Sequence, residues 1–203
     1  RSPWHVFFQL NDDVVFDLKD PGYLAAARSK LVFTNGWQFR DHENLRKHRQ
    51  AIKHIFSPRP EVVEAVASRQ QRLKAAQSDV LVGVHVRRGD YATWQGGMYC
   101  FPNEVYRARM SEVAQALQAR GQSPVFLLCS NETLDVAAFK PLRVVPGPGD
   151  AIEDLYTLAA CDLILGPPST YSLWASYYGG AALCHLQSAN APITLDDFAS
   201  LFA

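Results

Sequence analysis

The stretch VLVGVHVRRGDY, residues 80–91, decides the fold. Its first seven residues are apolar apart from Gly83 and His85, which is typical of a strand buried on both faces of a parallel sheet. Helices cover such a sheet on both sides, so the chain around it should alternate strands with helices. Side chains alternate along a strand, so we expect His85 and Arg87 to face one side and Arg88 the other.

The chain downstream of this stretch follows the expected alternation. We predict strands over residues 80–86, 124–129, 142–145, 162–165 and 181–186, and helices over residues 103–120, 132–139, 150–160 and 169–178. Asn103 is expected to cap the first of these helices, and Gly121 to end it. Five strands joined by four crossovers predict a Rossmann-like, doubly wound parallel sheet of order 3-2-1-4-5 in an α/β protein.

Upstream, the pattern is less regular. Residues 4–10 and 31–34 are predicted to be strands, and residues 41–55 and 61–76 helices. The two helices carry a cluster of basic residues, which a solvated face explains. The change of pattern near residue 80 predicts two domains, a partial N-terminal region over residues 1–79 and the sheet domain over residues 80–203.

Composition excludes several classes of protein. The 203 residues contain 20 Lys+Arg and 20 Asp+Glu, and this balance argues against nucleic acid as a partner. No apolar run approaches the roughly 20 residues that a transmembrane helix needs, although peripheral membrane contact stays compatible with the sequence. The opening residues 1–5 also lack the charged and then apolar profile of a signal peptide. No pattern predicts an oligomeric state.

The four cysteines indicate a compartment more than a chemistry. They lie far apart in the sequence without a C-x-x-C pair, so we expect reduced thiols rather than a zinc site. Reduced thiols point to a cytoplasmic location. A secretory lumen is the alternative if an N-terminal anchor precedes this sequence. Only there would the glycosylation sequon Asn131-Glu132-Thr133 matter.

Ligands of doubly wound sheets bind outside the carboxyl ends of the strands where the strand order reverses, here between the first and the fourth strand. The first of these two strands ends in residues 87–91, RRGDY. The planar fork of an arginine can bond two phosphate oxygens at once. The alternative is that Arg87 and Arg88 close the strand through salt bridges with Asp90 and neighbouring residues. We favour phosphate binding because of the position at the strand-order reversal.

The fourth strand leads into a predicted helix start at Ser169 and Thr170. Free backbone N–H groups and the helix dipole attract an anion there. A plain N-cap needs no ligand, and taken alone this would be the better interpretation. Opposite Arg87, we favour a phosphate cradle.

A third polar segment, residues 146–154, contains three carboxylates at the start of a predicted helix, Asp150, Glu153 and Asp154. Carboxylates in a first helical turn complement the helix dipole. Alternatively, one of them accepts hydrogen bonds from the edge of a guanine base, which presents adjacent N–H donors. The sequence leaves both interpretations open.

Three of these segments resemble the α-1,2-fucosyltransferases, the group of glycosyltransferase family 11. Residues 83–91 resemble that family's HxRRGDY motif, and residues 154–180 are similar to its second donor motif. Gly36-Trp37-Gln38 resembles its G-[YW]-[WF]-Q segment, so the resemblance covers residues 31–186. The family's N-terminal G-G-L-G-N-Q segment does not occur here. We therefore expect either that an N-terminal part is missing from this chain or that the protein is an abridged relative.

The resemblance implies a GT-B fold whose C-terminal donor domain binds GDP-fucose without a metal or other cofactor. The residues that it carries over to the donor site are His85, Arg87, Arg88, Asp154, Ser169 and Thr170. Arg87 would bind the β-phosphate, Ser169 and Thr170 would hold phosphate, and Asp154 would lie near the guanine.

The reaction implied is transfer of fucose to a glycan hydroxyl with inversion. Breaking the sugar–phosphate bond leaves negative charge on the β-phosphate, which Arg87 and the helix start at Ser169 would meet. A base must accept the proton of the acceptor hydroxyl. His85, Asp90 and a residue of an N-terminal part are the candidates. Two alternatives stay open: the same fold using another nucleotide sugar, and a non-catalytic relative that binds a nucleotide or a glycan.

Overall fold

The computed structural model describes residues 4–10, 14–36 and 39–200. The chain divides into two compact units, Arg1–Ile55 and Phe56–Ala203. Helix α4, Pro60–Leu73, belongs to the second unit because it packs on α6, Ala151–Ala159. The boundary expected from the sequence, between residues 79 and 80, lies beyond this helix.

In its described residues, the first unit combines short parallel strand pairs with three helices. Its elements are β1 His5–Gln9, β2 Phe16–Asp17, α1 Pro21–Ser29, β3 Leu31–Asn35, β4 Phe39–Arg40, α2 His42–Lys47 and α3 Arg49–Ile55. Strand β1 pairs with β3 and β2 with β4. The strands predicted at 4–10 and 31–34 are confirmed, whereas the single helix predicted over 41–55 is wrong. It divides at His48, where α2 ends.

Aromatic contacts hold this unit together. The rings of Phe8, Phe16 and Tyr23 lie 5.2 to 5.8 Å apart, so the start of α1 packs on β1 and β2. Helix α1 was not predicted from the sequence, although Asp20 caps it by accepting a hydrogen bond from the backbone N–H of Tyr23 at 2.8 Å. No described side chain of the unit is fully buried. Of the motif residues, Trp37 and Gln38 lie outside the described residues.

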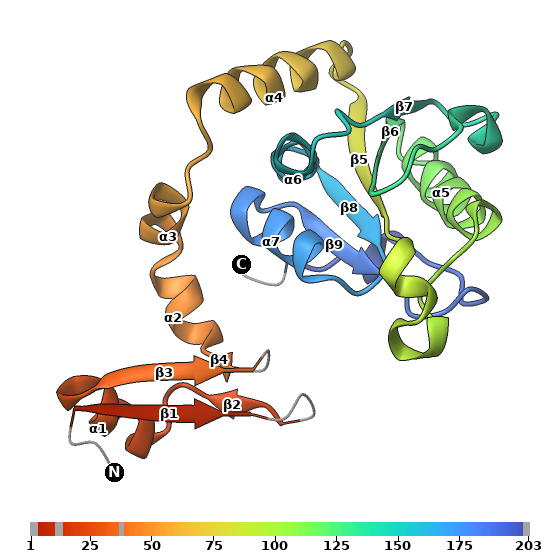
Figure 1. The fold of residues 1–203 in the computed structure, drawn as a ribbon. Coiled ribbons are helices and arrows are strands. Elements are labelled where there is room, and N and C mark those ends of the chain that lie inside the picture. The colour runs from red at the N-terminus through yellow and green to blue at the C-terminus, as the bar shows by residue number, and fades with distance from the viewer. Residues whose placement is uncertain (1–3, 11–13, 37–38, 201–203) are drawn as a thin grey trace. The chain divides into compact units, whose positions relative to one another are not determined.

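The second unit is built on a five-stranded parallel sheet (Figure 1). Its strands are β5 Asp79–Val86, β6 Ser123–Ser130, β7 Val144–Pro146, β8 Leu163–Gly166 and β9 Ala182–His185. They lie in the order β7-β6-β5-β8-β9, which confirms the predicted order 3-2-1-4-5. The α/β class and the Rossmann-like, doubly wound parallel sheet are therefore as predicted.

Helices cover both faces of the sheet. Besides α4 and α6 they are α5 Asn103–Gln118 and α7 Thr170–Gly179, with the 3-10 turns η1 Gly89–Ala92, η2 Trp94–Gly97, η3 Val136–Phe139 and η4 Leu195–Asp197. The helix predicted over 132–139 is mostly wrong, because only its last four residues form a turn, which Asp135 caps. Asn103 does not cap α5 either. The N-cap is Pro102, and the amide oxygen of Asn103 instead accepts a hydrogen bond from the Arg88 guanidinium.

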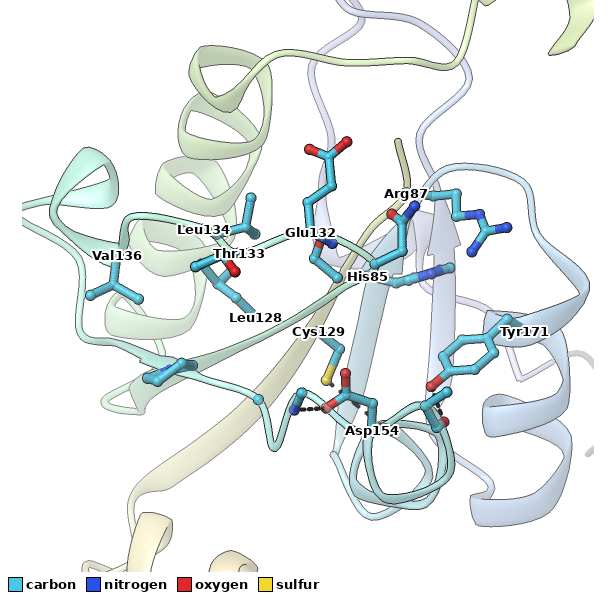
Figure 2. Close-up of a pocket in the computed structure, with 16 residues that line it drawn as sticks. His85, Arg87, Leu128, Cys129, Glu132, Thr133, Leu134, Val136, Asp154 and Tyr171 are labelled. Carbon is cyan, nitrogen blue, oxygen red and sulfur yellow. Dashed lines mark hydrogen bonds between the residues drawn. The ribbon is translucent and has the colours of Figure 1, made fainter. Parts of the chain in front are cut away.

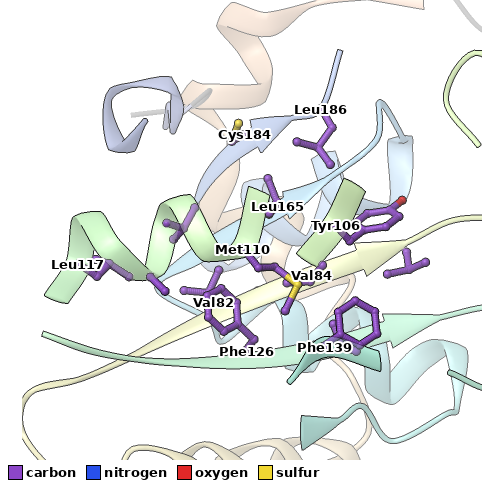
Figure 3. Close-up of a cluster of buried hydrophobic side chains, with 14 of the residues drawn as sticks. Val82, Val84, Tyr106, Met110, Leu117, Phe126, Phe139, Leu165, Cys184 and Leu186 are labelled. Atoms are coloured by element: carbon purple, nitrogen blue, oxygen red, sulfur yellow. The ribbon is translucent and has the colours of Figure 1, made fainter. Parts of the chain in front are cut away.

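Two apolar layers fix the sheet between its helices. On one face Val82 and Val84 of β5 pack with Met110 of α5 (Figure 3). On the other face Leu81 packs with Leu158 of α6. Each fully buried leucine or valine contributes about 1.5–3 kcal/mol through removal of its surface from water. The carboxyl edge of β5 is thereby held rigidly. None of the helices in the described part of the chain has the length and apolar composition needed to cross a membrane.

Helices α6 and α7 approach each other closely at their C-terminal ends. A Cβ atom built on Gly179 would lie 1.6 Å from the carbonyl oxygen of Ala159. Only glycine leaves room for this backbone contact. The contact brings the ends of α6 and α7 together at the edge of the sheet opposite the one from which α7 starts.

Candidate functional site

A cavity of about 420 Å³ opens at the carboxyl edge of the sheet. The ends of β5 and β6, the loop after β7 and the first turns of α6 and α7 form its walls (Figure 2). The residues that line it are His85, Arg87, Leu128–Leu134, Val136, Pro146, Gly147, Gly149, Ala151, Asp154 and Tyr171. His85, Arg87 and Asp154, which are up to 69 residues apart in the sequence, thus face one space.

Arg87 leaves the end of β5 and lies at the cavity wall with its side chain partly exposed. Its Nη2 atom is 3.0 Å from Oδ1 of Asp90, so the salt bridge expected as the alternative to phosphate binding forms at Arg87. The guanidinium also lies 5.8 Å from the centre of the Tyr91 ring, whose hydroxyl donates a hydrogen bond to the Pro168 carbonyl. A guanidinium has five N–H donors, so Asp90 orients Arg87 and leaves it able to bind an anion.

His85 is almost completely buried, with 4% of its surface exposed. Its ring lies 4.9 Å from the ring of Tyr171, and its Nδ1 atom has no hydrogen-bond partner among the described residues. Burial, helped by the charge of Arg87, lowers the pKa of His85 to about 4, so the ring is neutral at neutral pH. Buried polar atoms without a partner are uncommon in folded proteins. A ligand in the cavity could provide the missing partner.

Asp154 brings a buried carboxylate to the opposite wall of the cavity, with 5% of the residue exposed. Its Oδ1 atom accepts a hydrogen bond from the backbone N–H of Gly149 at 3.2 Å (Figure 2). Burial raises the pKa of Asp154 above the usual 3.8. Gly147 packs against the same oxygen, because a Cβ atom there would lie 2.7 Å from it. The carboxylate is therefore held in place as a hydrogen-bond acceptor.

The other two carboxylates of this helix start do not line the cavity. Asp150 caps α6 by accepting hydrogen bonds from the backbone N–H groups of Ile152 and Glu153 at 2.9 and 3.0 Å. Glu153 follows it on the helix and is not among the lining residues. Of the three candidates from the sequence, the structure brings only Asp154 to the cavity.

Four further predicted site residues lie outside the lining: Asp90, which pairs with Arg87 as described above, and Arg88, Ser169 and Thr170. The guanidinium of Arg88 bonds Asn103 and lies 3.9 Å from Glu132. The hydroxyl of Ser169 accepts a hydrogen bond from the backbone N–H of Tyr171 at 3.2 Å, which makes it an N-cap of α7, and Thr170 is exposed. The start of α7 still reaches Arg87 indirectly, through the bond between Tyr91 and Pro168.

Sequence reasoning missed two parts of the site. Tyr171 packs beside His85 and donates a hydrogen bond to the Ala151 carbonyl at 2.6 Å, which joins the starts of α6 and α7. The loop after β6 was assigned to a helix. The polar residues of this loop directly follow a buried strand, and this position could have indicated that they belong to the site. Among the described residues, no group of three or more His, Cys, Asp or Glu side chains could hold a metal ion.

A Rossmann-type sheet whose carboxyl edge presents an arginine and a buried carboxylate to one cavity has the architecture of the α/β domains that bind ligands at a strand-order reversal. The family model for glycosyl transferase family 11 matches residues 22–198, and the chain belongs to this family.

Comparison with individual proteins gives relatives that are named as fucosyltransferases. Galactoside alpha-(1,2)-fucosyltransferase 1 of Saimiri sciureus is 28% identical over 223 residues, which cover 100% of this chain and 55% of the relative. Galactoside alpha-(1,2)-fucosyltransferase 2 of Mus musculus is 27% identical over 133 residues, covering 60% of this chain and 37% of the relative. A mutant of Arabidopsis thaliana FUT1 in complex with GDP matches in structure with a TM-score of 0.54 and 13% identity, over 93% of this chain and 52% of that one. The chain thus spans about half the length of these relatives at most.

Proposed function

We propose that this chain forms the donor-binding part of a fucosyltransferase that transfers fucose from GDP-fucose to a glycan hydroxyl with inversion and without a metal. Membership of glycosyl transferase family 11 supports the reaction class, and the names of the relatives support fucose. The structural neighbour's GDP supports the nucleotide. The observation that carries the proposal is the convergence of His85, Arg87 and Asp154 on one cavity at the carboxyl edge of the sheet.

The guanine would be read at the Asp154 wall. Guanine presents N1–H and an exocyclic amine on one edge, and a fixed carboxylate can accept both as charge-assisted hydrogen bonds. His85 lines the same cavity, and its Nδ1 atom, which has no partner among the described residues, would be available to a polar atom of the nucleotide.

The diphosphate would lie against Arg87. When the bond between fucose and GDP breaks, the β-phosphate gains negative charge, and a preoriented guanidinium stabilises that charge more in the transition state than in the ground state. Asp90 and Tyr91 supply the orientation. This arrangement provides the positive charge that a metal ion would otherwise supply.

Neither His85 nor Asp90 suits the role of the base that inversion requires. The lowered pKa of His85, about 4, makes it a weak proton acceptor. Asp90 is paired with Arg87, and taking up a proton would weaken that pair. We therefore assign both residues to positioning and binding rather than to proton transfer.

Isothermal titration with GDP tests the proposal. We expect Arg87→Ala to weaken GDP binding by about 1.5–3 kcal/mol, the scale of hydrogen bonds to a charged group, which is roughly 10- to 150-fold in affinity. Arg87→Lys should recover little, because an ammonium cannot replace the planar fork. Arg120→Ala, which removes an exposed arginine between α5 and β6, is the matched control. Equal GDP affinity in wild type and Arg87→Ala would refute the assignment.

A further inference from the structure

The side chain of Asn131 holds the backbone of the residue that follows Arg87. Its Oδ1 atom accepts a hydrogen bond from the N–H of Arg88 at 3.0 Å, and its Nδ2 atom donates one to the carbonyl of Arg88 at 3.2 Å. One carboxamide thus satisfies both backbone groups of a single residue. Asn131 also belongs to the cavity lining.

The position of this contact explains why a side chain makes it. The pairing of β5 with β6 ends at Val86 and Ser130, where both strands leave the sheet. A carboxamide carries the same donor and acceptor as a peptide unit. Asn131 therefore adds one more pair of hydrogen bonds beyond the last backbone pair of the two strands.

Gly89 makes room for this arrangement. Its φ of +67° lies in the left-handed region that favours glycine, and a Cβ atom there would lie 3.0 Å from Nδ2 of Asn131. On the other side, the Arg88 guanidinium is anchored on Asn103 at the start of α5. The backbone next to Arg87 is thus held by β6 and by α5, while the Arg87 side chain faces the cavity.

We propose that Asn131 is a positioning residue, which fixes the backbone turn from which Arg87 reaches the phosphates of the nucleotide. This inference rests on the proposed function, since it assumes that Arg87 binds the diphosphate. It also gives the sequon Asn131-Glu132-Thr133 a different meaning. Both polar atoms of the Asn131 amide bond the Arg88 backbone, so the asparagine serves the site rather than a glycan.

Titrations of GDP and of guanosine into four variants test the inference. Asn131→Ala removes the carboxamide, and Asn131→Leu keeps its approximate shape without its hydrogen bonds. Asn190→Ala removes an exposed carboxamide outside the cavity lining and is the control, and Arg87→Ala is the reference for loss of phosphate binding. We expect both Asn131 variants to bind GDP about fivefold more weakly, the factor that loss of one net hydrogen bond produces. Guanosine has no phosphate, so its affinity should stay at the wild-type value.

Three results would overturn the inference. GDP affinity within twofold of wild type in Asn131→Leu, alongside a clear loss in Arg87→Ala, would leave the proposed function standing and remove the role of Asn131. Equal losses for GDP and guanosine would show a general disturbance of the cavity instead of a role at the phosphates. A wild-type protein that binds no GDP would refute the proposed function and this inference together.

Discussion

Replacing Asp154 by Asn removes one negative charge from the cavity and changes little of its shape. The Oδ1 atom of Asn can still accept the hydrogen bond from the Gly149 N–H. The amide then presents N–H donors to the ligand where the carboxylate presented an acceptor. Guanine offers N–H donors on the edge that we assign to this wall. In Asp154→Asn, the N–H donors of the amide would therefore face the N–H donors of the base.

The structure allows the size of the effect to be worked out. Asp154 is 5% exposed, so water cannot easily replace the lost acceptor. Hydrogen bonds to a charged group contribute about 1.5–3 kcal/mol, which corresponds to roughly 10- to 150-fold in GDP affinity. ADP lacks the matched donor pair, so its affinity should hardly change. The preference for GDP over ADP should therefore shrink by most of that factor.

Competition titrations of GDP and ADP against wild type and Asp154→Asn measure this preference. Glu153→Gln and Asp150→Asn are matched controls, because they remove carboxylates of the same helix start that do not line the cavity. Burial raises the pKa of Asp154, which means that the folded protein disfavours its charged form. Asp154→Asn should thus melt no lower than wild type. An unchanged preference for GDP in this variant would refute guanine recognition by Asp154.

Three further predictions follow from other features. GDP binding should be unaffected by EDTA, as checked by titration after dialysis, and restoration of lost binding by Mn²⁺ would contradict the metal-independent site. Gly179→Ala should unfold roughly 6–12 °C lower in a thermal melt, because overpacking against the Ala159 carbonyl lowers the free energy of unfolding by about 3 kcal/mol. This loss outweighs the better helix propensity of alanine. An unchanged melting temperature would disprove the close packing. Because burial lowers the pKa of His85 to about 4, the unfolded chain takes up a proton at a higher pH than the folded one, and the free energy of unfolding should fall as the pH drops from 6.5 towards 4. In denaturant titrations, His85→Gln should make the free energy of unfolding depend less on pH over this range. An equal pH dependence in both proteins would speak against a neutral buried ring.

The sheet could be predicted from the sequence because strands buried on both faces are continuous apolar runs. Residues 80–86 form such a run, and the order of all five strands followed from their alternation with helices. The alternation of side chains along β5 predicted that His85 and Arg87 share a side, and both line the cavity. Both predictions rest on the local pattern of apolar and polar residues, which determines the faces of a strand that are buried in the core.

The missed parts depend on contacts between distant segments. Residues 132–139 have a helix-like composition, but the bonds of Asn131 to the Arg88 backbone hold the start of this segment in a loop. Side-chain contacts also determine which of two neighbouring arginines, and which of several nearby carboxylates, lines the cavity. Asn103 and Glu132 draw the Arg88 guanidinium aside, and the cap at Asp150 leaves Asp154 as the carboxylate that faces the cavity. The partners of Arg88 are distant in the sequence: Asn103 is 15 residues away and Asn131 is 43.

The described residues that line the cavity all belong to the unit Phe56–Ala203, and this has a thermodynamic consequence. A ligand stabilises only the structure that must stay folded to bind it, by RT ln(1 + [L]/Kd). Ligand binding therefore raises the free energy of unfolding of the unit Phe56–Ala203, which contains the large buried core. The unit Arg1–Ile55, which has no fully buried side chain among its described residues, gains none of this energy directly. Nucleotide would then widen the gap in stability between the two units, and unfolding that looks like one transition without ligand would separate into two at saturation.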